Sequence, residues 1–306
     1  CHTLKHSRNL HKDSYPLTQL VQSYPALQPH VLIKPDGGKT IDFANPNGVK
    51  ALNAALLSHY YQVKFWDVPA GYLCPPVPGR ADYVHYLADL LAKDNQGVVP
   101  KGNTIKGLDI GTGANVIYPI IATRSYGWQM VGTDIDPVSI KSANTIIASN
   151  SVLTSHINVR QQAEQQHIFT AVVKPDEHFA FCMCNPPFHQ SAEQAKAVSQ
   201  RKIQNLTKNK TKRGSHVSAE KQSATLNFAG QSNELWCEGG ELQFIQRMIT
   251  ESRDYASQIR WFSCLVSKKD NLIQIYKSLR ELGISDVKTV EMAQGQKVSR
   301  FVAWRF

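Results

Sequence analysis

The most informative stretch of the sequence is Thr104-Ile-Lys-Gly-Leu-Asp-Ile-Gly-Thr-Gly-Ala114, an apolar run that ends in a glycine-rich turn. Gly111 and Gly113 allow a tight turn from a strand into a helix and let the backbone approach a bound ligand closely. Val116 stands where the dinucleotide fingerprint Gly-x-Gly-x-x-Gly has its third glycine, which argues against NAD. Asp109, two positions before the first glycine, suits a nucleotide-like cofactor with a cationic amino-acid end.

Short apolar runs and helical stretches alternate from this point onward, which is typical of βαβ units with a parallel sheet. The pattern predicts strands near 104–110, 129–134, 156–161, 178–184 and 259–266. It predicts helices from Asp136-Pro137 to about 149, around 242–249 and over 272–282. Residues 284–292 and 297–306 flank Ala-Gln-Gly295-Gln and predict an antiparallel hairpin. The predicted fold class is therefore α/β: a Rossmann-like, mostly parallel seven-stranded sheet with a C-terminal antiparallel hairpin, as in class I SAM-dependent methyltransferases.

The first 100 residues have a different pattern. Residues 1–45 alternate basic, proline and aromatic positions without sustained periodicity, so we expect an extended arm. Asn45-Pro46 predicts a helix start, since apolar residues follow it at helical spacing, and a second amphipathic helix is predicted over 80–94. We therefore expect a basic N-terminal arm and helical module (1–100) and a methyltransferase domain (101–306).

A basic insertion is predicted within the second domain, around 196–233. Residues 196–221 hold eight Lys and Arg residues against one acid, among Ser, Thr, Gln and Asn. The segment lacks the apolar residues needed to pack, so we expect a surface loop. Contact with phosphates is the favoured role, and a solvated insertion is the alternative.

The composition favours a globular protein that binds a polyanion. The 306-residue chain has a formal net charge of +10, which makes nucleic acid the first candidate partner. Six cysteines without zinc-finger spacing predict free thiols and no metal site. No run reaches the roughly 18 apolar residues of a membrane span, and the start of the chain has no signal-peptide core. We expect no membrane partner and a cytoplasmic location.

Asp134 is expected at the tip of the second strand of this sheet, 25 residues after Asp109. A carboxylate at this place accepts hydrogen bonds from ribose hydroxyls. Asp136 is the alternative ribose ligand, but the following Pro137 fits a helix N-cap better. Together with the glycine turn, these residues favour S-adenosylmethionine (SAM) over NAD as the cofactor.

A catalytic motif is predicted at Asn185-Pro186-Pro187-Phe188, directly after the apolar run Phe-Ala-Phe-Cys-Met-Cys. The carboxyl ends of parallel strands meet at one edge of a sheet, so the motif should lie beside the glycine turn. The alternative is a plain proline turn after a buried strand.

These four residues suit methylation of an exocyclic amine, which is a poor nucleophile because its lone pair is delocalised into the ring. Hydrogen bonds from the amine to the Asn185 side-chain oxygen and the Pro186 carbonyl would orient both N–H groups and favour a more tetrahedral nitrogen. Preorganised acceptors of this kind lower a barrier, and the Phe188 ring offers a face on which a base stacks. No strong general base is needed, because the methylated amine loses its proton to solvent.

Four segments together carry a resemblance to a known family. They are Asp109-Ile-Gly-Thr-Gly113-Ala with Ile117-Tyr-Pro119, Asn185-Pro-Pro-Phe-His189, Gly71-Tyr-Leu-Cys-Pro-Pro-Val-Pro-Gly-Arg80-Ala-Asp-Tyr83, and Asn233-Glu-Leu-Trp-Cys-Glu-Gly-Gly240. From about Asp42 to the C-terminus the chain resembles the bacterial 23S ribosomal RNA adenine-N6 methyltransferase family, RlmF. That family is related to eukaryotic enzymes that methylate adenine in U6 small nuclear RNA.

The resemblance implies methyl transfer from SAM to N6 of one adenine, at position 1618 in the usual rRNA numbering. It places Asn185, Pro186, Pro187 and Phe188 at catalytic positions. It places Arg80 near the carboxylate of the cofactor, and the other cofactor-binding positions fall on Asp109, Gly111, Gly113, Asp134 and Asn185.

The resemblance also implies RNA contacts from the N-terminal arm and the basic insertion. The residues concerned are Lys5, Arg8, Lys12, Arg201, Lys202, Lys208, Lys210, Lys212 and Arg213. The expected partner is 23S rRNA or a ribosomal assembly intermediate, and we expect a monomer.

Several alternatives stay open at this point. An rRNA guanine-N2 methyltransferase also uses Asn-Pro-Pro-Phe followed by His, and a protein glutamine-N5 methyltransferase has a motif that normally ends in Tyr. A DNA adenine methyltransferase would more typically have Asp at the first motif position. A non-catalytic RNA-binding protein on a Rossmann scaffold is the alternative of another class, and intact Asp109, Gly111, Gly113 and Asn185 argue against it.

Overall fold

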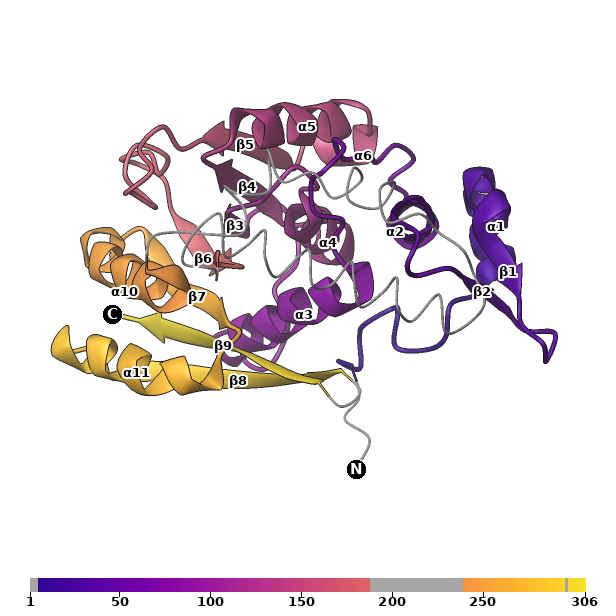
Figure 1. Ribbon diagram of the computed structural model, residues 1–306. Helices are drawn as coiled ribbons and strands as arrows, with labels where there is room; N and C mark the ends of the chain where they lie inside the picture. The colour runs from indigo at the N-terminus through magenta and orange to yellow at the C-terminus, as the bar shows by residue number, and fades with distance from the viewer. Residues whose placement is uncertain (1–4, 188–238, 295–296) are drawn as a thin grey trace.

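A mostly parallel sheet forms the centre of the molecule (Figure 1). The computed structural model describes residues 5–187, 239–294 and 297–306. Within them, seven strands pair in the order β5-β4-β3-β6-β7-β9-β8. Their bounds are β3 Lys106–Ile110, β4 Gln129–Asp134, β5 Ile157–Gln161, β6 Phe179–Cys184, β7 Ile259–Val266, β8 Asp286–Gln294 and β9 Lys297–Arg305.

The first five of these strands run parallel, and β9 is antiparallel to both β7 and β8. The predicted fold class is therefore confirmed, including the C-terminal hairpin. The order of the strands reverses between β3 and β6. An open α/β sheet binds its ligands at such a switch point, outside the carboxyl ends of the strands.

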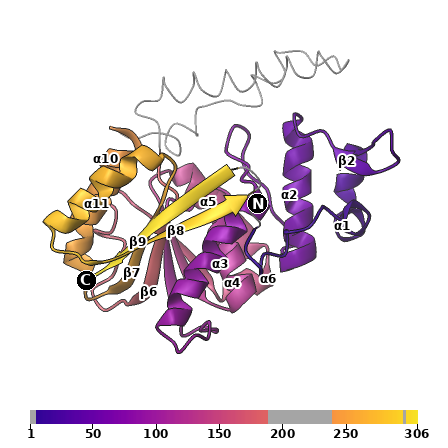
Figure 2. The same ribbon diagram turned by 90° about the horizontal axis from the view of Figure 1, so that it is seen from below.

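Helices cover both faces of the sheet, and Figure 2 shows α10 and α11 on one side with α3 and α4 on the other. The helices beside the sheet are α2 Pro46–Tyr61, α3 Val77–Lys93, α4 Ile117–Tyr126, α5 Pro137–Ala148, α6 Ser151–Thr154, α10 Gly240–Ser252 and α11 Leu272–Glu281. Two short 3₁₀ helices, Arg253–Tyr255 and Lys269–Asn271, lie at the end of α10 and before α11. The helices predicted at Asn45-Pro46, 80–94, Asp136-Pro137, 242–249 and 272–282 are confirmed as α2, α3, α5, α10 and α11.

Side chains of β6 alternate between two hydrophobic clusters, one on each face of the sheet. Phe181 and Met183 pack with the helices on the α3 and α4 side, whereas Cys182 and Cys184 pack with α10 and α11. All four side chains are almost completely buried. A strand buried on both faces reads as a continuous apolar run, which is how β6 is recognisable in the sequence.

The N-terminal residues differ from the expected extended arm. They form α1 (Leu17–Ser23), the 3₁₀ helix η1 (Pro25–His30) and two antiparallel strands, β1 (Val31–Ile33) and β2 (Lys39–Ile41). Leu20 and Leu27 are fully buried in the cluster that also holds α2. The expectation of an extended arm is therefore wrong for these residues. Each element has at most seven residues, too few for a helical or alternating pattern to show in the sequence.

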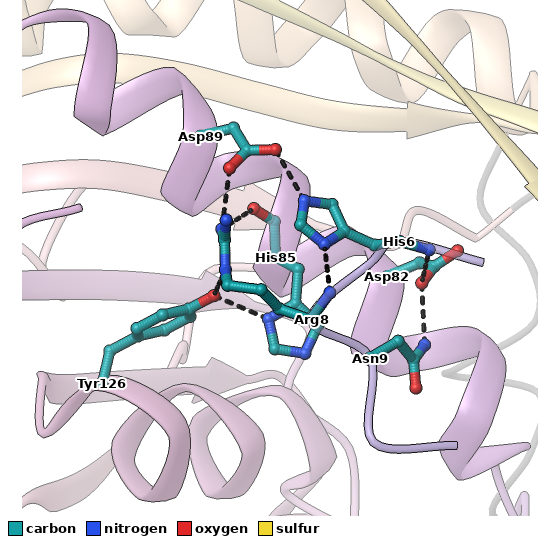
Figure 3. Close-up of polar contacts among 7 residues, drawn as sticks. All are labelled: His6, Arg8, Asn9, Asp82, His85, Asp89 and Tyr126. Atoms are coloured by element: carbon teal, nitrogen blue, oxygen red, sulfur yellow. Dashed lines mark hydrogen bonds and ion pairs between the residues drawn. The ribbon is translucent and has the colours of Figure 1, made fainter. Parts of the chain in front are cut away.

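Residues 5–12 are anchored along α3 by polar contacts, which Figure 3 shows. The Asp89 carboxylate lies 2.6 Å from His6 Nε2 and 2.7 Å from an Arg8 guanidinium nitrogen. The Asn9 side chain donates to Asp82 at 2.7 Å. His6, Asn9 and Asp82 are buried. The N-terminal segment is thus part of the folded body, and one hydrophobic cluster holds residues from both sides of position 100.

Within the described ranges, no helix has the length and apolar character needed to cross a bilayer. In the same part of the chain, no group of three or more His, Cys, Asp or Glu side chains is arranged to hold a metal ion.

Candidate functional site

A cavity of about 490 Å³ lies at the carboxyl ends of β3, β4, β5 and β6, at the switch point of the sheet. The glycine turn after β3 and the motif after β6 both line it. Its wall is formed by Leu73, Cys74, Pro75, Pro76, Arg80, Ile110, Gly111, Thr112, Gly113, Asn115, Ile117, Tyr118, Thr133, Asp134, Ile135, Gln162, Gln165, Gln166, His167, Ile168, Cys184, Asn185, Pro187, Phe244 and Arg247.

The glycine turn is held by hydrogen bonds that its own N–H groups donate to the end of the neighbouring strand β4. Gly111 and Gly113 have φ angles of 72° and 71°, a left-handed conformation that glycine adopts without strain. The N–H groups of Gly111 and Thr112 both donate to the Thr133 carbonyl, each at 2.9 Å. The N–H of Gly113 donates to the Asp134 carboxylate at 2.9 Å. The turn is therefore fixed before a ligand arrives.

Asp109 lies behind this turn with no exposed surface, and both its carboxylate oxygens lack a hydrogen-bond partner among the described residues. Burial raises the pKa of Asp109 to about 8; the Thr112 hydroxyl opposes this shift, and the nearby Asp134 charge adds to it. The hydroxyls of Thr112 and Tyr118 line the cavity and are buried as well; Thr112 lies near Asp109 and Tyr118 near Arg80, but neither hydroxyl makes a hydrogen bond of good geometry among the described residues. Such orphaned groups suit a ligand with a cationic amine and further polar atoms.

Asp134 and Asp136 both lie at this end of β4 and make different contacts. Asp136 is the N-cap of α5 and accepts from the Val138 N–H at 3.2 Å, so the N-cap prediction is confirmed. The hydroxyl of Tyr72 also donates to Asp136, at 2.5 Å. Asp134 lines the cavity, and burial raises its pKa to about 6.

Arg80 lies in the first turn of α3 and contributes to the cavity wall. A cation is disfavoured at the start of a helix unless an anion is close. Nowhere in the described ranges does a carboxylate form an ion pair with Arg80. Its guanidinium is therefore suited to an anionic group of a ligand in this cavity.

The motif after β6 lies beside the glycine turn, as the sequence predicts. The Asn185 backbone oxygen is 4.0 Å from the position that a Cβ atom at Gly111 would occupy. Asn185 and Pro187 line the cavity, and Pro186 is buried next to them. Among the described residues, the Asn185 side chain has no hydrogen-bond partner. Phe188 lies outside the described residues.

The basic residues predicted to contact RNA fall into two groups. The six in the insertion lie outside the described residues: Arg201, Lys202, Lys208, Lys210, Lys212 and Arg213. At the N-terminus, Lys5 donates to the His11 carbonyl at 3.2 Å and Lys12 to the Ser7 carbonyl at 3.1 Å. Arg8 donates to the Tyr126 hydroxyl at 3.0 Å in addition to its ion pair with Asp89. Arg8 and Lys12 are exposed, and Lys5 is partly buried.

Two parts of the cavity wall were not predicted. The loop after β5 contributes residues from Gln162 to Ile168, and α10 contributes Phe244 and Arg247, whose guanidinium carbon lies 5.4 Å from the Phe244 ring centre. The loop has no motif, but its place after a parallel strand is itself a signal, because such loops share one edge of the sheet.

Comparisons with known proteins identify the family of this chain. A family model described as RNA methyltransferase matches residues 2–306. The chain is 57% identical over 302 residues to the ribosomal RNA large subunit methyltransferase F of Pseudoalteromonas atlantica, covering 98% of this chain and 92% of that protein. It is 51% identical over 301 residues to the protein of the same name from Flavobacterium johnsoniae, covering 98% and 93%.

Solved structures show the same fold. The hMettl16 catalytic domain in complex with the MAT2A 3'UTR hairpin 1 is 30% identical with a TM-score of 0.79, covering 99% of this chain and 96% of that chain. The N-terminal domain of human METTL16 in complex with SAH is 28% identical with a TM-score of 0.73, covering 99% and 98%. The chain therefore belongs to the RNA methyltransferase family that includes the ribosomal RNA large subunit methyltransferases F.

Proposed function

We propose that this protein transfers a methyl group from SAM to N6 of one adenine in 23S rRNA, with Asn185 and Pro186 as the groups that orient the amine. The observation that carries the proposal is the meeting of the glycine turn and the Asn185 motif at one cavity. The relatives named ribosomal RNA large subunit methyltransferase F favour ribosomal RNA over a protein glutamine as the substrate. By resemblance, the target is the adenine at rRNA position 1618.

The cavity wall supplies groups for the ribose, the carboxylate and the ammonium group of the cofactor. Asp134 would accept hydrogen bonds from the ribose, Arg80 would pair with the carboxylate, and Asp109 would compensate the ammonium group from behind the glycine turn. Gly111 and Gly113 have no side chains, so the backbone of the turn leaves room for the ligand. SAM, when bound, supplies an activated methyl group on a positively charged sulfur.

The chain's own contribution to the chemistry lies at the end of β6. The Asn185 side-chain oxygen and the Pro186 carbonyl accept the two N–H groups of the adenine amine, which turns its lone pair away from the ring system. Pro186 and Pro187 restrict the backbone, so these acceptors are preorganised. Phe188 stacks on the base, which extends from the RNA as an unpaired or flipped nucleotide. The extra proton passes from the methylated amine to solvent.

The RNA is held by charge outside the cavity. Lys5, Arg8 and Lys12, with the basic residues of the insertion, contact phosphates. Residues 1–100 act as an RNA-facing module, and residues 101–306, with the insertion around 196–233, act as the methyltransferase domain. The protein works as a monomer in the cytoplasm on 23S rRNA or on a ribosomal assembly intermediate. An RNA-bound structural relative of similar fold supports an RNA substrate.

The test uses labelled SAM and rRNA that lacks the modification at position 1618. After reaction, the RNA is digested to nucleosides and separated by chromatography. We expect the label in N6-methyladenosine, and none with the matched Asn185→Ala variant. Label in N2-methylguanosine would instead support the guanine-N2 alternative, and no transfer to RNA despite measurable SAM binding would support the glutamine-N5 alternative.

A further inference from the structure

The end of β6, which carries Asn185, is not held by its neighbour β7 in the usual way. The two strands pair in parallel register at Phe179 with Ile259 and at Phe181 with Trp261. The same register would next pair Met183 with Ser263, but this pair is not formed, although β7 continues to Val266 and pairs with β9 along this length.

In a parallel ladder, a residue of one strand bonds to the two residues that flank its partner on the other strand. It accepts from the N–H of the residue after the partner and donates to the C=O of the residue before the partner. For Met183 these groups are the N–H of Cys184 and the C=O of Cys182. Both lie in a fully buried region, where unpaired backbone groups are costly. The structure satisfies both with side-chain hydroxyls.

Three hydrogen bonds replace the missing ladder residue. The Cys184 N–H donates to the Tyr83 hydroxyl at 3.2 Å, and the Ser263 hydroxyl donates to the Cys182 carbonyl at 2.8 Å. The two hydroxyl oxygens are 2.7 Å apart. Because the Ser263 hydroxyl donates its hydrogen to the Cys182 carbonyl, the Tyr83 hydroxyl must donate to Ser263. The direction of every bond is thereby fixed: Cys184 N–H to Tyr83, Tyr83 to Ser263, Ser263 to the Cys182 carbonyl.

Tyr83 is rigid enough to impose this arrangement on the strand. It is 1% exposed, stacks on Phe301 with ring centres 4.9 Å apart and meets Tyr118 edge-on at 5.5 Å. It lies three residues after Arg80 on α3, so one helix reaches both the cavity wall and the end of β6. Its ring cannot shift without disturbing both contacts.

We propose that Tyr83 is a positioning residue. Its hydroxyl, together with that of Ser263, takes the place of the missing pairing between β6 and β7 and sets the orientation of Asn185. This proposal rests on the proposed function, because it assigns Tyr83 a role in the turnover that Asn185 performs. Tyr83 touches neither the cofactor cavity nor the reacting atoms; it acts through the backbone of Cys184, the residue next to Asn185.

The test compares Tyr83→Phe and Ser263→Ala with Tyr61→Phe as the matched control. Tyr61 is equally buried, and its hydroxyl makes one hydrogen bond, to His11 at 2.8 Å, away from the cavity. Both Tyr→Phe changes keep the ring, so they remove only a hydroxyl. Turnover of RNA, the SAM dissociation constant and the melting temperature are measured for each variant.

We expect kcat to fall about 10- to 100-fold in Tyr83→Phe and in Ser263→Ala, because small displacements of an orienting group carry losses of this size. The SAM dissociation constant should stay within about twofold. The double variant should lose no more kcat than the more affected single variant, because either change interrupts the same chain of bonds. A kcat like that of Tyr61→Phe, or an equal loss of SAM affinity, would overturn the proposal.

Amide hydrogen exchange at Cys184 separates this proposal from the proposed function. The Cys184 N–H should exchange faster in Tyr83→Phe than in the unchanged protein, whether or not RNA is methylated. Equal exchange in the two proteins would overturn the positioning role. If the unchanged protein forms no N6-methyladenosine, the proposed function fails, while the exchange result still decides whether Tyr83 holds the end of β6.

Discussion

The Asp134 carboxylate accepts a hydrogen bond from the Gly113 backbone N–H at 2.9 Å. The residue proposed to hold the ribose of the cofactor therefore also fixes the glycine turn of the same cavity. The other carboxylate oxygen of Asp134 accepts from the Asp136 N–H, again at 2.9 Å. Ligand binding and the shape of the turn are thus coupled through one side chain.

Replacing Asp134 by Asn should weaken both functions. An amide nitrogen cannot accept a hydrogen bond, so one buried backbone N–H loses its partner, which costs about 1–3 kcal/mol of unfolding free energy. SAM affinity should fall at least about 10-fold, a loss of ~1.4 kcal/mol of binding free energy. Denaturant unfolding and calorimetric titration with SAM measure the two effects. Wild-type values in both experiments would show that neither contact matters.

Asp109 should make SAM binding depend on pH. Its pKa in the folded protein is about 8, above the ordinary value of 3.8, so the carboxyl is mainly protonated at pH 6. The folded state binds this proton more tightly than the unfolded state does. Protonated Asp109 therefore stabilises the fold below the unfolded pKa, and this stabilisation is lost as the pH rises through about 8. The groups that face it are Asp134, Thr112, Tyr118 and Cys184.

A cationic amine bound nearby lowers the pKa of Asp109, so SAM binding should release a proton and strengthen as pH rises from 5.5 to 7. Calorimetry in buffers of different ionisation enthalpy counts the released protons. Asp109→Asn should abolish the release and weaken SAM binding, while the SAM-free variant stays at least as stable at pH 8. Equal proton release in the variant would rule out Asp109 as the source.

Glu251 on α10 should control the shape of the cavity through the loop after β5. Its carboxylate accepts from the backbone N–H groups of Ile168, Phe169 and Thr170 at 2.8–3.2 Å. Glu251→Gln removes the charge and one acceptor, so the loop should loosen and SAM affinity should fall several-fold. Calorimetric titration with SAM measures the change.

Glu177→Gln is the matched control for this prediction. Although burial opposes its ionisation, hydrogen bonds from Arg160 and Lys106 lower the pKa of Glu177 to about 2, and it does not line the cavity. Glu177→Gln should lower stability without changing SAM affinity. If both variants bind SAM equally well, the loop does not depend on Glu251.

Arg8 and Lys12, both proposed to contact RNA, should differ in how much they stabilise the fold. Arg8→Ala removes bonds to Asp89, Tyr126 and the His85 carbonyl and should lower the unfolding free energy by about 1 kcal/mol. Lys12→Ala should leave stability unchanged, weaken RNA binding and reduce its salt dependence. Melting temperatures and RNA titrations at two salt concentrations check this. An unchanged salt slope in Lys12→Ala would remove Lys12 from the RNA surface.

The sheet and its ligand edge are predictable from the sequence because each depends on short-range signals. Strands buried on both faces read as continuous apolar runs, as at Phe179–Cys184, and Asp136-Pro137 marks a helix start within a single pair of residues. Since parallel strands end at one edge, the glycine turn and Asn185 could be brought together without coordinates.

The contacts that shape the cavity depend on tertiary packing and leave no such signal. Glu251 lies more than 80 residues from the loop it holds, and Tyr83 is 180 residues from Ser263. Residues 5–41 were missed for another reason: their elements are too short for periodicity, and their burial depends on surfaces supplied by α2 and α3.

The most direct test of the account measures single-turnover methyl transfer by Asn185→Ala at saturating SAM and RNA. If the Asn185 oxygen orients the amine, the rate should fall at least about 100-fold, as when one preorganised polar group is removed from an active site. The dissociation constants for SAM and RNA should change by no more than about threefold. A rate close to that of the unchanged protein, with N6-methyladenosine still formed, would contradict the account.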